Sequence, residues 1–155
     1  MPTIETTEYI EASPERVWQI LTDLDSYPEW NPFIVEGSGE FAEGEQVRLR
    51  MRPPEGREMG FKPVVLRVEQ ARELRWKGRL LVPGIFDGEH YFRLEPEGGG
   101  TRLHQGEDFT GLLPRFMGKM LRQTERGFLA LNAALKERAE SEAGSDRIDE
   151  GSTAV

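Results

Sequence analysis

A series of short alternating segments, followed by one long helical stretch, constrains the fold of this chain most strongly. Apolar and polar residues alternate over 3–11 and then in six further segments joined by short links: 33–39, 46–52, 60–69, 73–82, 85–95 and 101–110. A period of two predicts strands, and short links predict antiparallel pairing. From 114 to 139 the apolar spacing becomes helical. The pattern predicts an α+β domain in which a curved antiparallel sheet of about seven strands wraps around a long C-terminal helix.

Two short helices are expected between the first and second strands. Ser13 is a suitable N-cap, Pro14 suits the first helical turn, and the apolar stripe that follows consists of Val17, Ile20, Leu21 and Leu24. Two prolines within 27–33 then end the helix and hold the aromatic residues Tyr27, Trp30 and Phe33 in a bend. These aromatic side chains either form a wall of an apolar cavity or fill an ordinary core.

Several of these segments resemble the START-like helix-grip superfamily (SRPBCC), in particular its polyketide cyclase/dehydrase-like branch. The resemblance begins with Ser-Pro-Glu-Arg-Val-Trp at 13–18 and Tyr-Pro-Glu-Trp-Asn-Pro at 27–32, and it continues at 61–63, 73–76, 84–90, 100–103 and 109–113. It covers residues 3 to 139. It implies a helix-grip fold, but this superfamily includes lipid carriers, hormone receptors, allergens, ring-closing enzymes and chaperone cofactors. The fold therefore does not define the function.

Composition narrows the range of partners. The formal charge of −8 and the pI near 4.9 argue against nucleic-acid binding, which usually needs a basic face. The chain has no cysteine and only two histidines, which lie on different predicted strands, so we expect no metal site and no cofactor. No apolar run approaches the roughly 20 residues of a membrane-spanning helix, and no secretion pattern is present. We expect a cytoplasmic monomer whose partner is a small hydrophobic molecule.

The domain is expected to end near residue 140. The segment 141–155 is acidic, contains Gly and Ser, and has almost no large apolar side chains. Such a segment cannot bury enough apolar surface to offset the entropy lost on ordering. The sequence therefore predicts a START-like domain over residues 1–140 and a disordered acidic tail over 141–155.

The two halves of the long helix differ in side-chain size. Ala130, Ala133 and Ala134 allow a close approach to the sheet, whereas the N-terminal half carries Met117 and Met120, whose side chains adapt to variable ligands. The larger side chains either fill the core or line a ligand cavity, and the resemblance favours the cavity. The expected lining is Trp30, Phe33, Leu66, Trp76, Phe92, Phe109, Met117, Met120 and Leu121. Its entrance is expected between the Trp30 bend, the 84–88 hairpin and the start of this helix.

Strand register places polar side chains in the same cavity. Counting back from the turn at 97–100 sets His90 opposite Glu107 on the adjacent strand. The polar residues expected to face inward are Lys62, His90, Gln105 and Glu107. Buried charges are costly unless they are paired. The set therefore either handles a polar group of a ligand, with His90, Glu107 and Lys62 as catalytic candidates, or serves as a structural ion pair or a cluster that reaches solvent.

Two classes of function are compatible with these features. In the first, the protein binds a lipid-, polyketide- or aromatic-like ligand in the cavity between the sheet and the C-terminal helix. In the second, it is a cyclase/dehydratase-type enzyme that acts on a polyketide-like substrate, largely by orienting it. Because the inward face offers no complete catalytic set, binding is favoured. A protein-binding role similar to the Hsp90-activator branch is a third interpretation.

Overall fold

The computed structural model of the protein describes residues 3–79, 86–111 and 118–153, with side chains described as far as Ser141 except those of Arg79 and Phe86. In chain order the elements are β1 (Thr3–Ile10), α1 (Pro14–Thr22), a 3-10 turn η1 (Leu24–Ser26), α2 (Tyr27–Trp30), β2 (Ile34–Ser38), β3 (Arg48–Met51), β4 (Met59–Phe61), β5 (Val64–Glu69), β6 (Glu73–Arg79), β7 (Phe86–Glu97), β8 (Gly100–Gly111) and α3 (Gly118–Thr153).

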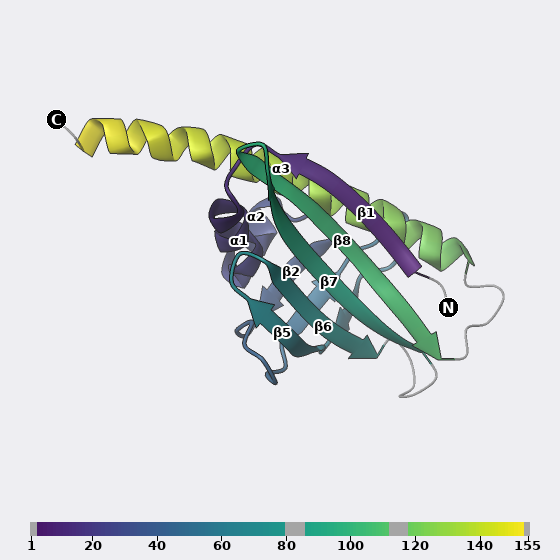
Figure 1. The fold of residues 1–155 in the computed structure, drawn as a ribbon. Helices are drawn as coiled ribbons and strands as arrows, with labels where there is room; N and C mark the ends of the chain where they lie inside the picture. Colours follow the sequence, from purple (N-terminus) through teal and green to yellow (C-terminus); the bar gives the residue numbers. More distant parts are fainter. Residues whose placement is uncertain (1–2, 80–85, 112–117, 154–155) are drawn as a thin grey trace.

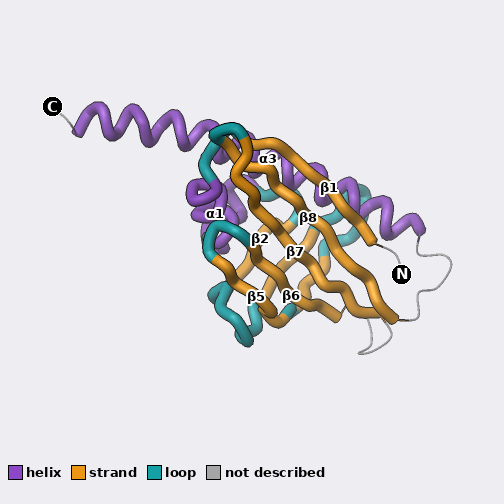
Figure 2. Tube along the Cα trace, viewed as in Figure 1, coloured by secondary structure: helices purple, strands orange, loops and turns teal. Residues whose placement is uncertain are grey.

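The strands form two antiparallel sheets that face a common interior. The larger sheet has the order β1-β8-β7-β6-β5, and the smaller has the order β2-β3-β4. In Figure 1, α3 crosses behind β1 and β8, and Figure 2 shows the smaller sheet, marked by β2, behind β6 and β7. Backbone hydrogen bonds such as Val47 N to Pro63 O, 3.0 Å, join the two sheets. The predicted fold class, a curved antiparallel sheet around a long C-terminal helix, is confirmed.

The first helix forms where the sequence predicts it. The Ser13 hydroxyl oxygen accepts a hydrogen bond from Arg16 N at 3.2 Å, which satisfies one of the unpaired donors of the first turn. The predicted stripe is buried, and the bend that follows is anchored by Tyr27, whose hydroxyl donates to Leu21 O at 2.6 Å. Burial, with Asp23 nearby, raises the pKa of Tyr27, so that this hydroxyl stays protonated.

One predicted strand, 60–69, is two strands in the structure. The chain leaves the smaller sheet after β4 and enters the larger one at β5, and the break falls at Lys62 and Pro63, because proline cannot donate to a ladder. A register irregularity between Val65 and Arg67 follows. Val65 is 1% exposed, whereas Leu66 is 42% exposed. The inward placement of Leu66 and Lys62 was therefore wrong, since simple alternation does not hold across this segment.

The two longest strands keep an unbroken register. β7 and β8 pair from Phe86 opposite Gly111 to Glu97 opposite Gly100 with no bulge, and His90 lies opposite Glu107 as predicted. The tight turn between them, with positive φ angles at Gly98 and Gly99, sets this register.

The final helix is longer than its packed part. Its inward residues Phe128, Leu131, Leu135 and Ala139 are fully buried. α3 then continues to Thr153, into the segment for which the sequence predicts disorder, and that expectation stays a prediction. No helix within the described residues is apolar enough over a sufficient length to cross a bilayer.

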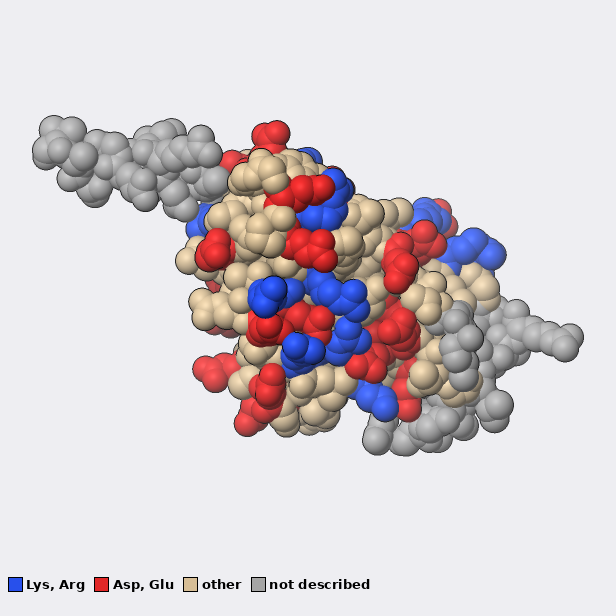
Figure 3. Space-filling model, in the orientation of Figure 1, with Lys and Arg blue, Asp and Glu red and all other residues tan. Residues whose placement is uncertain are grey.

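The outer face of the larger sheet is strongly charged. Basic and acidic side chains interleave over the face turned toward the viewer in Figure 3. Glu73 lies within 3.6 Å of Arg67, 3.3 Å of Arg75 and 3.1 Å of Arg93. Arg75 and Arg93 both cover the ring of Tyr91, at 5.0 and 4.5 Å from its centre. Ion pairs of this kind keep one face of the sheet solvated while the other face contacts α3.

Candidate functional site

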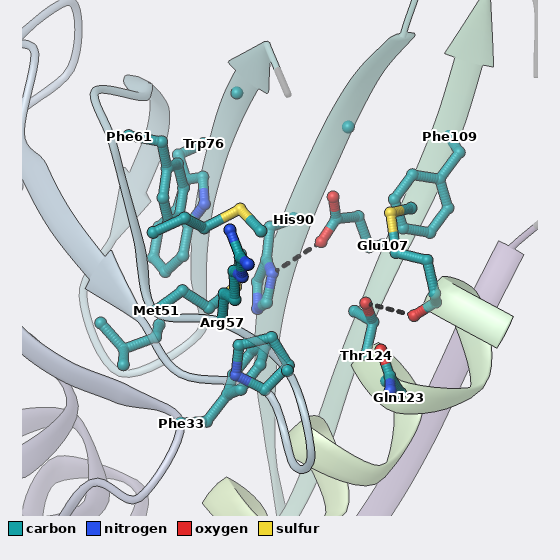
Figure 4. Close-up of a pocket in the computed structure, with 17 residues that line it drawn as sticks. Phe33, Met51, Arg57, Phe61, Trp76, His90, Glu107, Phe109, Gln123 and Thr124 are labelled. Carbon is teal, nitrogen blue, oxygen red and sulfur yellow. Dashed lines mark hydrogen bonds and ion pairs between the residues drawn. The ribbon is translucent and has the colours of Figure 1, made fainter. Parts of the chain in front are cut away.

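A cavity of about 230 Å³ lies between the inner face of β6–β8, the smaller sheet and the beginning of α3. Figure 4 shows the side chains that point into it. The apolar lining among the described residues consists of Phe33, Ile34, Met51, Pro53, Met59, Phe61, Trp76, Phe109 and Met120. The polar and glycine lining consists of Gly56, Arg57, Gly78, Gly88, His90, Glu107, Gln123 and Thr124. The cavity therefore combines aromatic and aliphatic walls with a small set of polar residues.

His90 lies in an aromatic enclosure at the floor of the cavity. Its ring stacks on Trp76, with centroids 4.7 Å apart and an interplanar angle of 16°. Phe128 contacts the ring edge to face at 4.7 Å, and Phe92 lies at 4.9 Å. Only 4% of His90 is exposed. Its ring is thus held in one orientation by packing from β6, β7 and α3.

Both ring nitrogens of His90 have a side-chain partner. Nδ1 lies 3.1 Å from Glu107 Oε1, and Nε2 lies 3.0 Å from Gln105 Oε1. The side chain of Glu107 is 12% exposed. The predicted juxtaposition of His90 and Glu107 is therefore present, and it forms part of the cavity wall, as the dashed line in Figure 4 shows.

A buried amide network continues behind this pair. Gln105 Nε2 donates to Asn132 Oδ1 at 2.6 Å and to Phe128 O at 3.2 Å. Asn132 Nδ2 donates to the Thr6 hydroxyl at 2.8 Å, and that hydroxyl donates to Gln105 O at 2.7 Å. The network joins β8, α3 and β1, and sequence reasoning missed two of its members. Thr6 shares the inward face of β1 with Ile4, and Asn132 lies one turn beyond Phe128, so alternation and helical spacing are the signals that identify them.

Gly88 makes room for the carboxyl group of Glu107. A Cβ atom added at Gly88 would collide with Glu107 Oε2. Among the described residues, no hydrogen bond reaches Oε2, whereas Oε1 is engaged by His90. Glu107 thus presents one oxygen to His90, while the other lies beside Gly88, and both Gly88 and Glu107 line the cavity.

The loop between β3 and β4 forms the outer rim of the cavity. Pro53, Gly56 and Arg57 line the cavity from this loop, and Arg57 is exposed. Glu55 of the same loop lies 3.6 Å from Arg126 of α3. The expected entrance stays a prediction. The start of α3, Gly88 and Phe33 of the aromatic bend line the cavity together with the β3–β4 loop, and residues 84 and 85 lie outside the described residues.

The residues predicted for the site divide into five groups. Phe33, Trp76, His90, Glu107, Phe109 and Met120 line the cavity. Phe92 and Gln105 are fully buried and contact His90 from behind. Trp30 and Leu121 pack against the core but are not among the described lining residues; Trp30 contacts the Tyr27 ring instead, at 5.2 Å. Leu66 and Lys62 are exposed, and Met117 lies outside the described residues.

The smaller sheet contributes the lining that sequence reasoning missed. Met51, Met59 and Phe61 come from β3 and β4, and Ile34 begins β2. Met51 lies in the predicted strand 46–52, but no local pattern shows that β3 and β4 turn away from the larger sheet to cover the cavity. Within the described chain, no group of three or more His, Asp or Glu side chains is placed to hold a metal ion.

The overall structure is similar to solved structures of low sequence identity. The Zhui aromatase/cyclase from Streptomyces sp. R1128 superposes with a TM-score of 0.76 at 21% identity, over 92% of this chain and 95% of that one. A START superfamily protein from Mycobacterium smegmatis gives a TM-score of 0.72 at 24% identity, over 90% of this chain and 97% of that one. These likenesses show a shared fold.

Sequence comparison identifies the family. No curated protein matches the chain at a significant level. The family described as polyketide cyclase / dehydrase and lipid transport matches residues 1–140, which is nearly all of the chain and includes every residue of the cavity wall described above. The chain therefore belongs to the polyketide cyclase/dehydrase and lipid transport family.

Proposed function

We propose that the protein binds a small hydrophobic ligand in the cavity between the larger sheet, the smaller sheet and α3. One observation carries the proposal: the cavity has aromatic and aliphatic walls and few polar side chains, among them the hydrogen-bonded pair His90 and Glu107. Ligand sites commonly combine mostly apolar walls with a few polar groups that orient the ligand. Membership of a family that includes lipid transport supports the same reading.

The size of the cavity favours a compact ligand. Its volume of about 230 Å³ lies somewhat below the range of roughly 300 to 1,000 Å³ that is common for ligand pockets. His90 and Phe41 already stack on the Trp76 ring, so the aromatic side chains of the wall, Trp76, Phe33 and Phe109, offer edge contacts to an aromatic or polyketide-like ring system. A fused bicyclic aromatic compound is therefore a better first probe than a long acyl chain.

A glycine substitution tests the proposal without removing any contact. Gly78 lines the cavity, and a Cβ added there would lie 3.4 Å from the Phe61 ring, an ordinary contact. Gly78→Leu fills cavity space, so it should weaken naphthalene and 1-naphthol binding at least tenfold, as measured by nuclear magnetic resonance (NMR) shifts of the Trp76 indole. Gly60→Leu is the matched control, because Gly60 is exposed on β4 and does not line this cavity. Equal binding by both variants, or no binding by the wild type, would contradict the proposal.

A second candidate function is catalysis of the cyclase/dehydratase type. The Glu107 oxygen that faces the cavity favours it, since a carboxylate there can accept a proton from a C–H bond next to a ligand carbonyl. That proton then passes to the departing β-hydroxyl group, which leaves as water, and a C=C bond forms in the ligand. Incubation with 3-hydroxy-1-tetralone, which yields 1-naphthol on loss of water, tests this candidate. Turnover that disappears in Glu107→Gln supports the enzyme; ligand binding without turnover supports a carrier or sensor.

Action as a cytoplasmic monomer is part of the proposal. Light scattering after size-exclusion chromatography measures the mass, and a single 17.7 kDa species is expected. A stable dimer would contradict the monomeric state and would leave the cavity proposal standing.

A further inference from the structure

The amide network behind the cavity determines where the protons of His90 lie. A backbone carbonyl can only accept a hydrogen bond, so the Gln105 atom that lies 3.2 Å from Phe128 O is the amide nitrogen. Asn132 Oδ1 is the second acceptor of that nitrogen, at 2.6 Å. The other Gln105 atom, which lies 3.0 Å from His90 Nε2, is therefore the oxygen. Because this oxygen can only accept, Nε2 of His90 carries a hydrogen.

The second ring nitrogen also faces an acceptor. Nδ1 lies 3.1 Å from Glu107 Oε1, and a hydrogen bond there needs one more proton between the two atoms. The groups that face the ring from the surrounding elements are Trp76 of β6, Phe92 of β7, Gln105 and Glu107 of β8, and Phe128 of α3. A stacked tryptophan ring and an adjacent carboxylate both stabilise a cation. None of these contacts is a cation, and Arg57, the cationic residue of the described cavity lining, is exposed on the rim loop, so the arrangement suits a protonated imidazole.

We infer that His90 is an imidazolium held by Gln105 and Glu107, and that Glu107 Oε2 is the acceptor for a hydroxyl or phenol group of the ligand. This inference rests on the proposed ligand binding and names the ligand class: a compact apolar molecule with one hydrogen-bond donor at its inner end. His90 is then a positioning residue, since both of its nitrogens are engaged inside the protein. Glu107 is the residue that contacts the ligand.

Neither Thr124 nor Arg57, two other polar residues of the cavity lining, replaces Glu107 in this role. The Thr124 hydroxyl donates to Met120 O at 2.8 Å within α3. Arg57 lines the cavity from the rim loop, but its guanidinium group can only donate, so it cannot accept a hydrogen bond from the ligand. Gly88 keeps space open beside Oε2, which a side chain there would occupy. A ligand that lacks a donor leaves a partly desolvated carboxylate oxygen without a partner, and that loss is worth roughly tenfold to a hundredfold in affinity.

The ligand-free protein tests the first half of the inference. NMR of ¹⁵N-labelled protein distinguishes an imidazolium from the two neutral tautomers, and His104, the second histidine, serves as the internal reference. At pH 7 we expect protons on both nitrogens of His90 in the wild type. In Glu107→Gln we expect a neutral ring that keeps its proton on Nε2. A wild-type His90 with a proton on only one nitrogen would overturn the inference, whatever ligands bind.

Three matched probes test the second half. The wild type should bind 1-naphthol at least tenfold more tightly than 1-methoxynaphthalene or naphthalene, because only 1-naphthol can donate to Oε2. Glu107→Leu should abolish this preference. Gly88→Ala should reduce this preference although it removes no donor or acceptor. This variant replaces Glu107→Leu in the test if Glu107→Leu does not fold. Equal wild-type binding of all three probes would overturn the inference and leave the proposed function standing, whereas binding of none would contradict both.

Discussion

Strands β6, β7 and β8 carry charged side chains on both faces, and the two sets have different surroundings. On the outer face, Arg75 lies 3.3 Å from both Glu73 and Glu89, and the Glu89 side chain is 38% exposed. On the inner face, His90 and Glu107 are 5% and 12% exposed and lie between aromatic rings. Alternate residues of the same strands thus place one charged set on the outer face, where Glu89 reaches water, and the other beside the cavity.

This difference in solvent contact changes what each charge contributes. Glu73 is only 13% exposed, but it has three arginine neighbours, so the loss of one leaves others, and water reaches the half-exposed Arg67 and Arg93. His90 has two fixed partners and almost no access to water. The outer set therefore contributes mainly to solubility, and the inner pair contributes to stability and to the chemistry of the site.

The largest expected effect, on the free energy of unfolding, follows the loss of the inner carboxylate. Glu107→Ala leaves His90 Nδ1 without its partner in a nearly dry site, and it should lower the free energy of unfolding by about 2–3 kcal/mol. Glu89→Ala is the matched control on the outer face, and it should cost less than about 1 kcal/mol. Urea unfolding of both variants measures the two values. Equal losses would show that the inner site is as well solvated as the outer face.

Added salt should distinguish the ion pairs of the two faces by a smaller difference, in their coupling energy. A double-mutant cycle on Arg75 and Glu89 should give a coupling of about 0.5 kcal/mol that largely disappears in 1 M NaCl, because exposed pairs are screened. The corresponding cycle on His90 and Glu107 should keep most of its coupling under the same conditions, since ions do not enter the site. Coupling of the inner pair that falls with salt as steeply as the outer one would contradict the comparison.

The smallest expected effect belongs to an ion pair on α3 that lies beside β1 and has intermediate exposure. Lys136 Nζ donates to Glu140 Oε1 at 2.8 Å and to Tyr9 O at 2.7 Å. The hydrogen bond from Lys136, followed by one from the backbone N–H of Glu11, lowers the pKa of Glu140. A carboxyl whose folded pKa lies below its unfolded pKa stabilises the fold above the unfolded value, and this contribution is lost as the pH falls through the folded pKa.

Glu140→Gln tests that sign directly. At pH 7 it should be less stable than the wild type by about 0.3 kcal/mol. The difference should shrink as the pH falls below the ordinary carboxyl pKa of 4.5. Glu137→Gln, on an exposed position of the same helix, should show no such convergence. Thermal unfolding between pH 7 and pH 3 measures both variants, and a gap that widens on acidification would show the opposite sign.

The sequence predicted the site correctly where the prediction depended on neighbours within one hairpin. His90 faces Glu107 because β7 and β8 are long, continuous and joined by a tight turn, so a count of two from 97–100 reaches the correct pair. The same count failed at Leu66, where Pro63 ends one ladder and an irregular register begins another. Periodicity is reliable only as far as the ladder is unbroken.

The remaining parts of the site come from segments far apart in the chain. Thr6 and Asn132 meet through a hydrogen bond across 126 residues, and no local pattern specifies that contact. Trp30 was expected at the cavity, but its ring packs on Tyr27, and Met51 and Phe61 of the smaller sheet line the wall instead.

The amino-acid sequence by itself determined the order of strands and helices, the capped first helix and the His90–Glu107 register, because each depends on neighbours within one element or one hairpin. Only the tertiary structure decided where the cavity lies. A cavity is the space that packed elements leave unfilled, so it depends on how β3 and β4 turn away from the larger sheet, on the approach of Glu55 to Arg126, and on the room that Gly88 leaves for Glu107.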